Sequence, residues 1–344
     1  MASLSENRIP SLDGLRAISI GTVLLAHAST HFVLTPLHIK SVHAVLAMLS
    51  YFGVTVFFVI SGFLITMLLV REYSRTSQID LGGFYRRRAV RILPASLFYV
   101  AIIVLLGHPS IIQSVFALTF TTSYYFDHSY RPLQHLWSLS VEEQFYFLWP
   151  LVFATGLRNA RRYCWVMMAV CPLVRIALRG TGYVDYSYRA PAIADSLAAG
   201  CLLAFYQDRM REIVKKYFVC PVPFLVLCLV TVVTAGVLYR TQFVLLWGLI
   251  PCLIALSTCA AIERRDPFLN SRPLVWMGLL SYSLYLWQQP FLVFDGPLNY
   301  LSVRLLLTFA AAYISYRFIE QPMLRFRAPA TVTCKGTNAA MDTA

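Results

Sequence analysis

The 344-residue sequence is 58% hydrophobic and only 13% charged, with a mean hydropathy of +0.64. A soluble domain carries about twice that charged fraction, so the composition excludes an ordinary soluble enzyme and indicates a polytopic membrane protein. The net charge of +13 would suggest nucleic acid if the basic residues gathered on one surface. They lie instead in short loops between apolar stretches, which predicts membrane lipids and no nucleic acid as partners.

The first apolar stretch, residues 12–34, is long enough to span a bilayer and carries Asp13, Arg16 and His27. Ionisable groups inside a span are costly, so they are functional by default. Arg16 and His27 are eleven residues apart, which places both on one helix face, about 16 Å apart along the axis. The stretch has no charged n-region and no small-residue cleavage site, so we expect a permanent span and not a signal peptide.

Further apolar segments follow along the whole chain. If the short apolar piece 111–120 also crossed the membrane, every later basic loop would face the wrong side. We therefore predict an all-α integral membrane protein, a bundle of about ten transmembrane helices with a re-entrant or interfacial segment over 108–134, between the third and fourth helices. Both termini are then cytoplasmic. The expected spans are 12–34, 44–70, 90–106, 136–156, 163–178, 191–206, 218–239, 243–262, 274–294 and 299–319.

The cysteines and the C-terminal end add little chemistry. The eight cysteines are scattered and form no CxxC pair, so the sequence predicts neither a disulfide framework nor a zinc site. Residues 328–344 are small and polar, which predicts a disordered tail after a membrane domain over residues 1–327.

Two adjacent acidic residues, Glu142 and Glu143, lie about two turns into the span 136–156. Trp137, near the start of this span, is expected at the outer interface, where aromatic anchors gather. His27 lies in the outer third of the first span, so a carboxylate and an imidazole are expected at similar depth. Such a pair fixes the imidazole tautomer and raises the basicity of the free nitrogen, as a general base requires. The alternative is a structural polar pair between helices.

The densest basic run is FYRRRAVRILP, residues 84–94. Arg88 and Arg91 are three residues apart on one helix face, so they could clamp a phosphate. The run could equally be a topology signal that binds anionic lipid headgroups. In the second span, Gly53, Ser61 and Gly62 would allow another helix or an extended ligand to approach closely. Ser61 lies in no GxSxG motif, which argues against a serine hydrolase.

Two other carboxylates have basic neighbours. Asp195, a turn into the span 191–206, could pair with Arg189 or with Arg175. Glu320 lies beside Arg317 at the end of the last span. There we expect a structural ion pair.

Six segments, taken in order across about residues 8–325, resemble the acyltransferase-3 family of integral membrane O-acyltransferases. This family acylates bacterial surface polysaccharides, nodulation factors and some macrolides. The segments are LDGLR with His27 at the eleventh position after its arginine, FFVISGFLI, RRRAVRILP, HLWSLSVEEQFY, SYSLYLW and FIEQP.

The resemblance implies that an acyl group, usually acetyl, moves from cytoplasmic acyl-CoA to a hydroxyl of a carbohydrate or glycolipid at the outer face of the bacterial cytoplasmic (inner) membrane. Acetyl-CoA is then a donor substrate, and no permanently bound cofactor or metal is implied. The acceptor class comprises lipopolysaccharide O-antigen, exopolysaccharide and similar glycans. No esterase-like domain follows the last span, so we expect transfer to finish within the membrane domain or with another protein.

The resemblance also implies roles for single residues. His27 is cast as the essential catalytic residue, either a general base or a transient acyl carrier. Gln288 stands where many members have histidine, which leaves that position's role in acceptor binding open. The other expected catalytic residues are Arg16, Glu142 and Glu143; those expected at the CoA end are Arg87, Arg88, Arg91 and Ser61; and those expected to bind the acceptor are Trp137, Asp195 and Gln288.

A different class of function uses the same buried groups. In a proton-coupled membrane transporter, His27, Glu142 and Asp195 would relay protons. A non-catalytic membrane scaffold is disfavoured by the number of charges within the spans.

Overall fold

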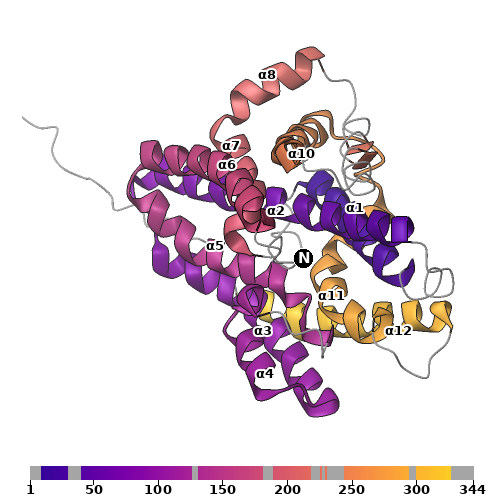
Figure 1. The fold of residues 1–344 in the computed structure, drawn as a ribbon. Helices are drawn as coiled ribbons and strands as arrows, with labels where there is room; N and C mark the ends of the chain where they lie inside the picture. The colour runs from indigo at the N-terminus through magenta and orange to yellow at the C-terminus, as the bar shows by residue number, and fades with distance from the viewer. Residues whose placement is uncertain are drawn as a thin grey trace, which may run out of the picture.

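The computed structural model describes residues 9–29, 40–125, 131–180, 189–217, 225–226, 229–230, 244–293 and 300–326. Within these residues the regular elements are helices, with no strand, which confirms the all-α class (Figure 1). In chain order they are α1 (Pro10–Ser29), α2 (Lys40–Thr76), α3 (Leu81–Gly107), α4 (Ile111–Leu118), η2 (Thr122–Tyr124), η3 (Arg131–Leu133), α5 (Leu136–Ala154), α6 (Leu157–Gly180), α7 (Ala190–Phe205), α8 (Gln207–Tyr217), α10 (Val244–Arg264), α11 (Arg272–Leu292), α12 (Leu301–Ser315), the π-helical turn η6 (Tyr316–Glu320) and α13 (Gln321–Leu324).

Nine of the ten predicted spans coincide with a helix in the described residues. The span 218–239 falls mostly outside the described residues, and the tail 328–344 lies wholly outside them. The apolar piece 111–120 forms the short helix α4, whose N-cap Ser110 exchanges side-chain hydrogen bonds with Gln113 in a capping box. The charged helix α8 was not predicted.

Three helices in the described part of the chain are long and apolar enough to cross a membrane. The predicted count of about ten spans is therefore not confirmed by this criterion. Helices α1, α5 and α11 fall short because each carries buried polar side chains, which lower its mean hydropathy. The three helices that qualify cover Val45–Thr76, Leu81–Gly107 and Leu301–Leu324.

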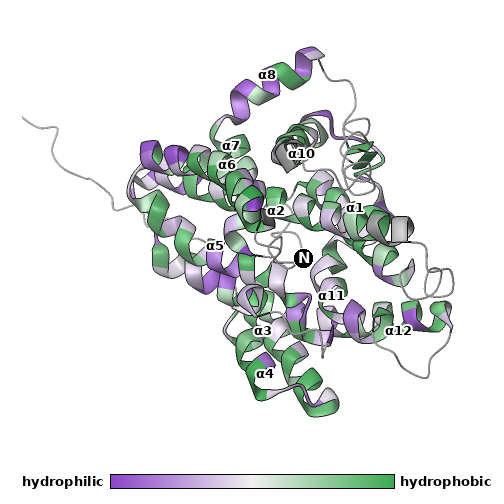
Figure 2. Ribbon diagram, in the orientation of Figure 1, coloured by the Kyte–Doolittle hydropathy of each residue, from purple (hydrophilic) through white to green (hydrophobic). Residues whose placement is uncertain are grey.

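Exposed apolar side chains identify the surface as one suited to lipid. Ile111 of α4 is 80% exposed and Leu106 at the end of α3 is 77% exposed, and α6 exposes Trp165 and Leu173. Hydrophobic residues cover most of the helices, whereas hydrophilic ones gather on α8 (Figure 2). A soluble protein rarely exposes apolar area on this scale, so the chain is a membrane protein.

Helix α2 lies at the centre of the bundle and packs against α1, α5, α7 and α10 (Figure 1). Its contact with α7 is backbone to backbone. A Cβ atom added to Gly62 would collide with the carbonyl of Leu197, and one added to Gly200 would collide with the carbonyl of Val59. The predicted close approach at Gly62 is therefore confirmed, with a helix as the neighbour. Because α1 packs against both α2 and α11, the side chains of these three helices meet inside the bundle.

Candidate active site

The described residues contain two polar clusters along the bundle interior, contributed largely by α1, α2, α3, α5 and α11. We call them the charged cluster and the imidazole cluster. The charged cluster consists of Arg16, Ser61, Arg88, Arg91, Glu142, Glu143 and Tyr146. The imidazole cluster consists of His27, His135, Tyr285, Trp287 and Gln288.

A short hydrogen-bond chain forms the centre of the charged cluster. The hydroxyl of Tyr146 donates to Ser61 Oγ over 3.0 Å, and Ser61 Oγ donates to Glu142 Oε1 over 2.7 Å. The guanidinium carbon of Arg88 lies 5.1 Å from the centre of the Tyr146 ring, a cation–π contact. Three helices, α2, α3 and α5, thus meet around one half-buried carboxylate.

Arg16 joins this cluster from α1. Its guanidinium lies 3.5 Å from Asp13, one turn earlier, and it also interacts electrostatically with Glu142 and Arg91. Charges inside a bundle persist where opposite charges compensate one another, and here the half-buried arginines and carboxylates do so. The cluster still presents several guanidinium groups, which are well suited to binding phosphate.

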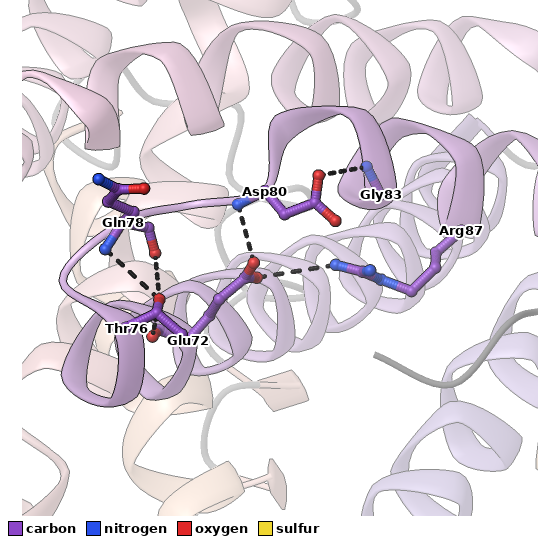
Figure 3. Close-up of polar contacts among 6 residues, drawn as sticks. All are labelled: Glu72, Thr76, Gln78, Asp80, Gly83 and Arg87. Atoms are coloured by element: carbon purple, nitrogen blue, oxygen red, sulfur yellow. Dashed lines mark hydrogen bonds and ion pairs between the residues drawn. The ribbon is translucent and has the colours of Figure 1, made fainter. Parts of the chain in front are cut away.

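The arginine run of α3 divides between two environments. Arg87 forms a 3.7 Å ion pair with Glu72 at the α2–α3 turn, where Glu72 also accepts a hydrogen bond from the Asp80 backbone amide (Figure 3). Asp80 in turn accepts from the Gly83 amide and so caps the N-terminus of α3 (Figure 3). Arg88 faces Tyr146 instead. Within the run, Arg87 therefore anchors the turn, whereas Arg88 and Arg91 belong to the charged cluster.

His27 has a partner that fixes its tautomer. Its Nδ1 lies 3.0 Å from Gln288 Oε1, and Gln288 is only 1% exposed. An amide oxygen can only accept, so Nδ1 carries the proton and the lone pair is on Nε2. The prediction that Glu142 orients His27 is wrong, because Gln288 occupies that position and Glu142 binds Ser61.

Helix α5 begins inside the bundle, with its first residues buried. His135 and Trp137 are only 5% and 9% exposed, and the Trp137 ring packs edge-on against Phe58 with ring centres 6.3 Å apart. Trp137 is thus a core residue and not a lipid-facing anchor, whereas its depth in the membrane stays a prediction. Because α5 begins inside the bundle, Glu142 lies about 10 Å further along the axis than His135. It reaches the level of Arg16, and His135 is the α5-side residue that interacts with His27.

The second imidazole, His135, is held from several sides. Its ring lies 5.6 Å from the Tyr99 ring, in an edge-on contact, and 5.0 Å from the Tyr285 ring. The hydroxyl of Tyr285 donates to the His135 carbonyl over 2.5 Å and accepts from Ser138 Oγ over 3.0 Å. These contacts tie α11 to the start of α5.

Asp195 forms the pair with Arg175 that the sequence left open. Its Oδ2 lies 2.6 Å from Arg175 Nη2, and Arg175 Nη1 donates to the Ala192 carbonyl over 2.6 Å. Asp195 is fully buried and Arg175 is 1% exposed. This ion pair joins α6 to α7 and belongs to neither cluster.

The predicted pair between Glu320 and Arg317 is wrong. Arg317 Nη1 donates to Gln321 Oε1 over 2.9 Å, whereas Glu320 is buried and accepts from Ser283 Oγ over 3.1 Å. Glu320 ends the π-helical turn η6, which changes the phase of the helix and turns this carboxylate inward. There it interacts electrostatically with Arg91 and Arg16.

The structure therefore brings together most of the predicted site. It adds Tyr146, His135 and Glu320 as polar groups beside the predicted ones. Tyr146 is four residues after Glu142, so the helical period alone could have placed it on the same face. His135 and Glu320 lie in two of the six family segments, HLWSLSVEEQFY and FIEQP, but nothing in the sequence assigned either of them to the site. The predicted residues in the charged cluster are Arg16, Ser61, Arg88, Arg91, Glu142 and Glu143; those in the imidazole cluster are His27 and Gln288; and those outside both are Arg87, Trp137 and Asp195.

A helical membrane protein with an oriented imidazole beyond a group of half-buried arginines is the class that the fold and the site define. Comparison with protein families is consistent with that class. The model of a family described as an acyltransferase domain matches residues 9–319. The chain belongs to this acyltransferase-3 family.

Curated relatives share the same region. The chain is similar to O-acetyltransferase OatA of Staphylococcus aureus, with 30% identity over 93% of this chain and 58% of that protein. It is also similar to peptidoglycan O-acetyltransferase OatA of Listeria monocytogenes, with 27% identity over 93% of this chain and 56% of that protein. For the putative peptidoglycan O-acetyltransferase YrhL of Bacillus subtilis the identity is 28%, over 92% and 55%. The chain thus spans somewhat more than half the length of these relatives. No solved structure matches it.

Proposed function

We propose that this chain transfers an acetyl group from acetyl-CoA to a hydroxyl of a cell-surface glycan. The single observation that carries the proposal is the hydrogen bond from His27 Nδ1 to Gln288 Oε1, because it leaves Nε2 as a base inside a membrane domain. The names of the relatives support acetyl as the group and make a peptidoglycan-type glycan the first acceptor to test, ahead of lipopolysaccharide or exopolysaccharide.

The proposed reaction needs one base and one leaving group. His27 Nε2 takes the proton of the acceptor hydroxyl while its oxygen attacks the thioester carbonyl carbon. The carbon–sulfur bond then breaks, and the CoA thiolate takes the proton from the imidazolium of His27. Arg16 is the cation of α1 nearest to this path, about 16 Å from His27 along the helix axis.

The proposed donor site is the charged cluster. Arg88 and Arg91 bind the CoA phosphates, and the extended pantetheine arm passes Arg16 to bring the thioester to His27. This arrangement requires the charged cluster to face the cytoplasm. It fits the topology proposed for the whole domain: about ten spans, both termini cytoplasmic and a re-entrant or interfacial α4, in the bacterial inner membrane.

The test uses purified protein in proteoliposomes with labelled acetyl-CoA and chitotetraose, a soluble β-1,4-linked N-acetylglucosamine tetramer. We expect wild-type protein to acetylate the sugar and His27→Ala to lose at least about 100-fold in kcat, the usual contribution of a general base. Full activity in His27→Ala would overturn the role of His27. Proton uptake without any acetyl transfer by the wild type would instead support the transporter.

A further inference from the structure

The imidazole cluster contains nitrogen atoms that find no hydrogen-bond partner within the described part of the chain. They are Nδ1 and Nε2 of His135, Nε1 of Trp287 and Nε2 of Gln288. Their side chains are 5%, 8% and 1% exposed, respectively. The backbone at Pro132 and Leu286 approaches the His135 ring, but not in hydrogen-bonding geometry.

Leaving such groups unsatisfied is costly. A buried polar group without a partner costs about 1–3 kcal/mol, and folded proteins keep few of them. The His135 ring is nevertheless fixed by Tyr99 and Tyr285, and its carbonyl is fixed by the Tyr285 hydroxyl. A rigid imidazole with free nitrogens, whose neighbour Tyr99 also packs edge-on against the Trp287 ring, is an arrangement that a ligand would complete.

The chemistry of these atoms selects the ligand. Trp287 Nε1 and Gln288 Nε2 can only donate, whereas a neutral imidazole both donates and accepts. A sugar hydroxyl, which also donates and accepts, matches the imidazole, and other sugar oxygens match the two donors. The cluster holds no arginine or lysine, so CoA phosphates find their partners at Arg88 and Arg91 instead.

We infer that His135, Trp287 and Gln288 form the acceptor subsite, in which His135 holds the reacting hydroxyl of a carbohydrate against His27. This inference rests on the proposed function, since it assigns a place to the acceptor of that reaction. His27 contacts Gln288 and the His135 ring contacts Tyr285, three residues earlier on α11, so both imidazoles meet the same turn of that helix. His135 binds the substrate, and His27 takes its proton.

Two substitutions of the same residue separate binding from packing. His135→Phe keeps a ring against Tyr99 and Tyr285 but has no nitrogen, whereas His135→Gln keeps a donor and an acceptor but has no ring. We expect His135→Phe to raise the KM for chitotetraose about tenfold, as the loss of one or two hydrogen bonds predicts. His135→Gln should recover much of that loss. The KM for acetyl-CoA should stay within about twofold of wild type in both, because the proposed donor site lies in the charged cluster.

If the His135 variants fail to reach the membrane, a variant of Trp287 tests the same subsite. Trp287→Phe removes one donor and keeps the aromatic contact with Tyr99. We expect it to raise the KM for chitotetraose severalfold, again with an unchanged KM for acetyl-CoA.

Three results would overturn the inference. An unchanged KM in both His135→Phe and Trp287→Phe would mean that ordered water satisfies these nitrogens. Better activity in His135→Phe than in His135→Gln, with the KM for both substrates rising together, would mean a packing role. Failure of wild-type protein to bind chitotetraose by calorimetry would remove the subsite itself. Binding without acetyl transfer, weakened tenfold in His135→Phe, would keep the subsite while the proposed function fails.

Discussion

The two polar clusters of this bundle differ in charge, although both lie within one membrane domain. The charged cluster gathers Arg16, Arg88 and Arg91 around Glu142, so its burial depends on opposite charges that compensate one another. The imidazole cluster has no such charges and consists of His27, His135 and neutral donors.

The two clusters are therefore suited to different steps of the proposed reaction: the charged cluster to donor binding and the imidazole cluster to proton transfer. Guanidinium groups attract a polyanionic donor, but an imidazole beside them would be harder to protonate during the reaction. Separating His27 from Arg16 by about 16 Å along α1 keeps the base away from these cations.

The imidazole cluster is most sensitive at Gln288. Gln288→Leu removes the acceptor that fixes the His27 tautomer, so we expect kcat to fall about 10- to 100-fold, the equivalent of about 1.4–2.7 kcal/mol. The KM for acetyl-CoA should not change, because the donor site lies at the other cluster. Gln288→Glu keeps an acceptor and should keep most of kcat. Steady-state kinetics in proteoliposomes measures both parameters. A rise in the KM for acetyl-CoA with an unchanged kcat would contradict the separation of the base from the donor site.

The charged cluster should show the opposite kinetic pattern. Arg88→Ala removes one charge-assisted contact to phosphate, so we expect the KM for acetyl-CoA to rise about tenfold or more with a smaller change in kcat. Arg87→Ala should have a weaker effect, because Glu72 already pairs with Arg87. The exposed neighbour Arg86 provides the matched control, with no expected change in donor KM. Equal effects at all three positions would favour a general role in topology or lipid binding.

The α2–α7 contact supports the charged cluster through Ser61, the neighbour of Gly62. Gly62→Ala would force the two backbones apart, so we expect a loss of about 1–3 kcal/mol in stability, as for overpacking elsewhere. Gly21→Ala is the control, since an added Cβ there would meet its nearest atom, in Met277, at an ordinary 3.6 Å. Thermal unfolding in detergent compares the two variants. A larger loss in Gly21→Ala would show that the α2–α7 approach is not the tighter one.

An ion pair at the end of α10 offers a solvent-accessible comparison with the buried charges. Glu263, beyond the expected span 243–262, lies 3.0 Å from Lys215 and 2.7 Å from Arg211. Partial burial would raise the pKa of Glu263, but Lys215 and Arg211 outweigh it and hold that pKa below its ordinary value. Its stabilisation is therefore present above the unfolded-state pKa and is lost as pH falls through the lower folded-state value.

For Glu263→Gln we expect a loss of at most about 1 kcal/mol near pH 7, because the pair is partly exposed and screened by salt. The difference in unfolding free energy between wild type and Glu263→Gln should shrink as the pH falls. Thermal unfolding of both proteins from pH 7 down to pH 4 measures this difference. A difference that grows at low pH would contradict the sign of this pKa shift.

Much of the architecture follows from the sequence alone. Runs of about twenty apolar residues must form helices in a membrane, because no water is present there to satisfy the backbone. The period of the helix places Arg16 and His27 on one face of α1, and the small side chains around Gly62 indicate a close helix contact. The six ordered motifs indicated the family that the comparison with family models then showed.

The partners of the buried polar groups were decided only by the tertiary structure. Sequence spacing gives depth along one helix, but the relative depth of two helices depends on where each begins in the packed bundle. Because α5 begins inside the bundle, Glu142 lies at the level of Arg16 and Ser61, and His135 is the residue of α5 that interacts with His27. In the same way, the π-helical turn directed Glu320 toward Ser283, and Gln288 of α11 became the partner of His27. A displacement of two helical turns, about 10 Å, is invisible in the hydrophobic pattern, yet it determines which side chains can react together.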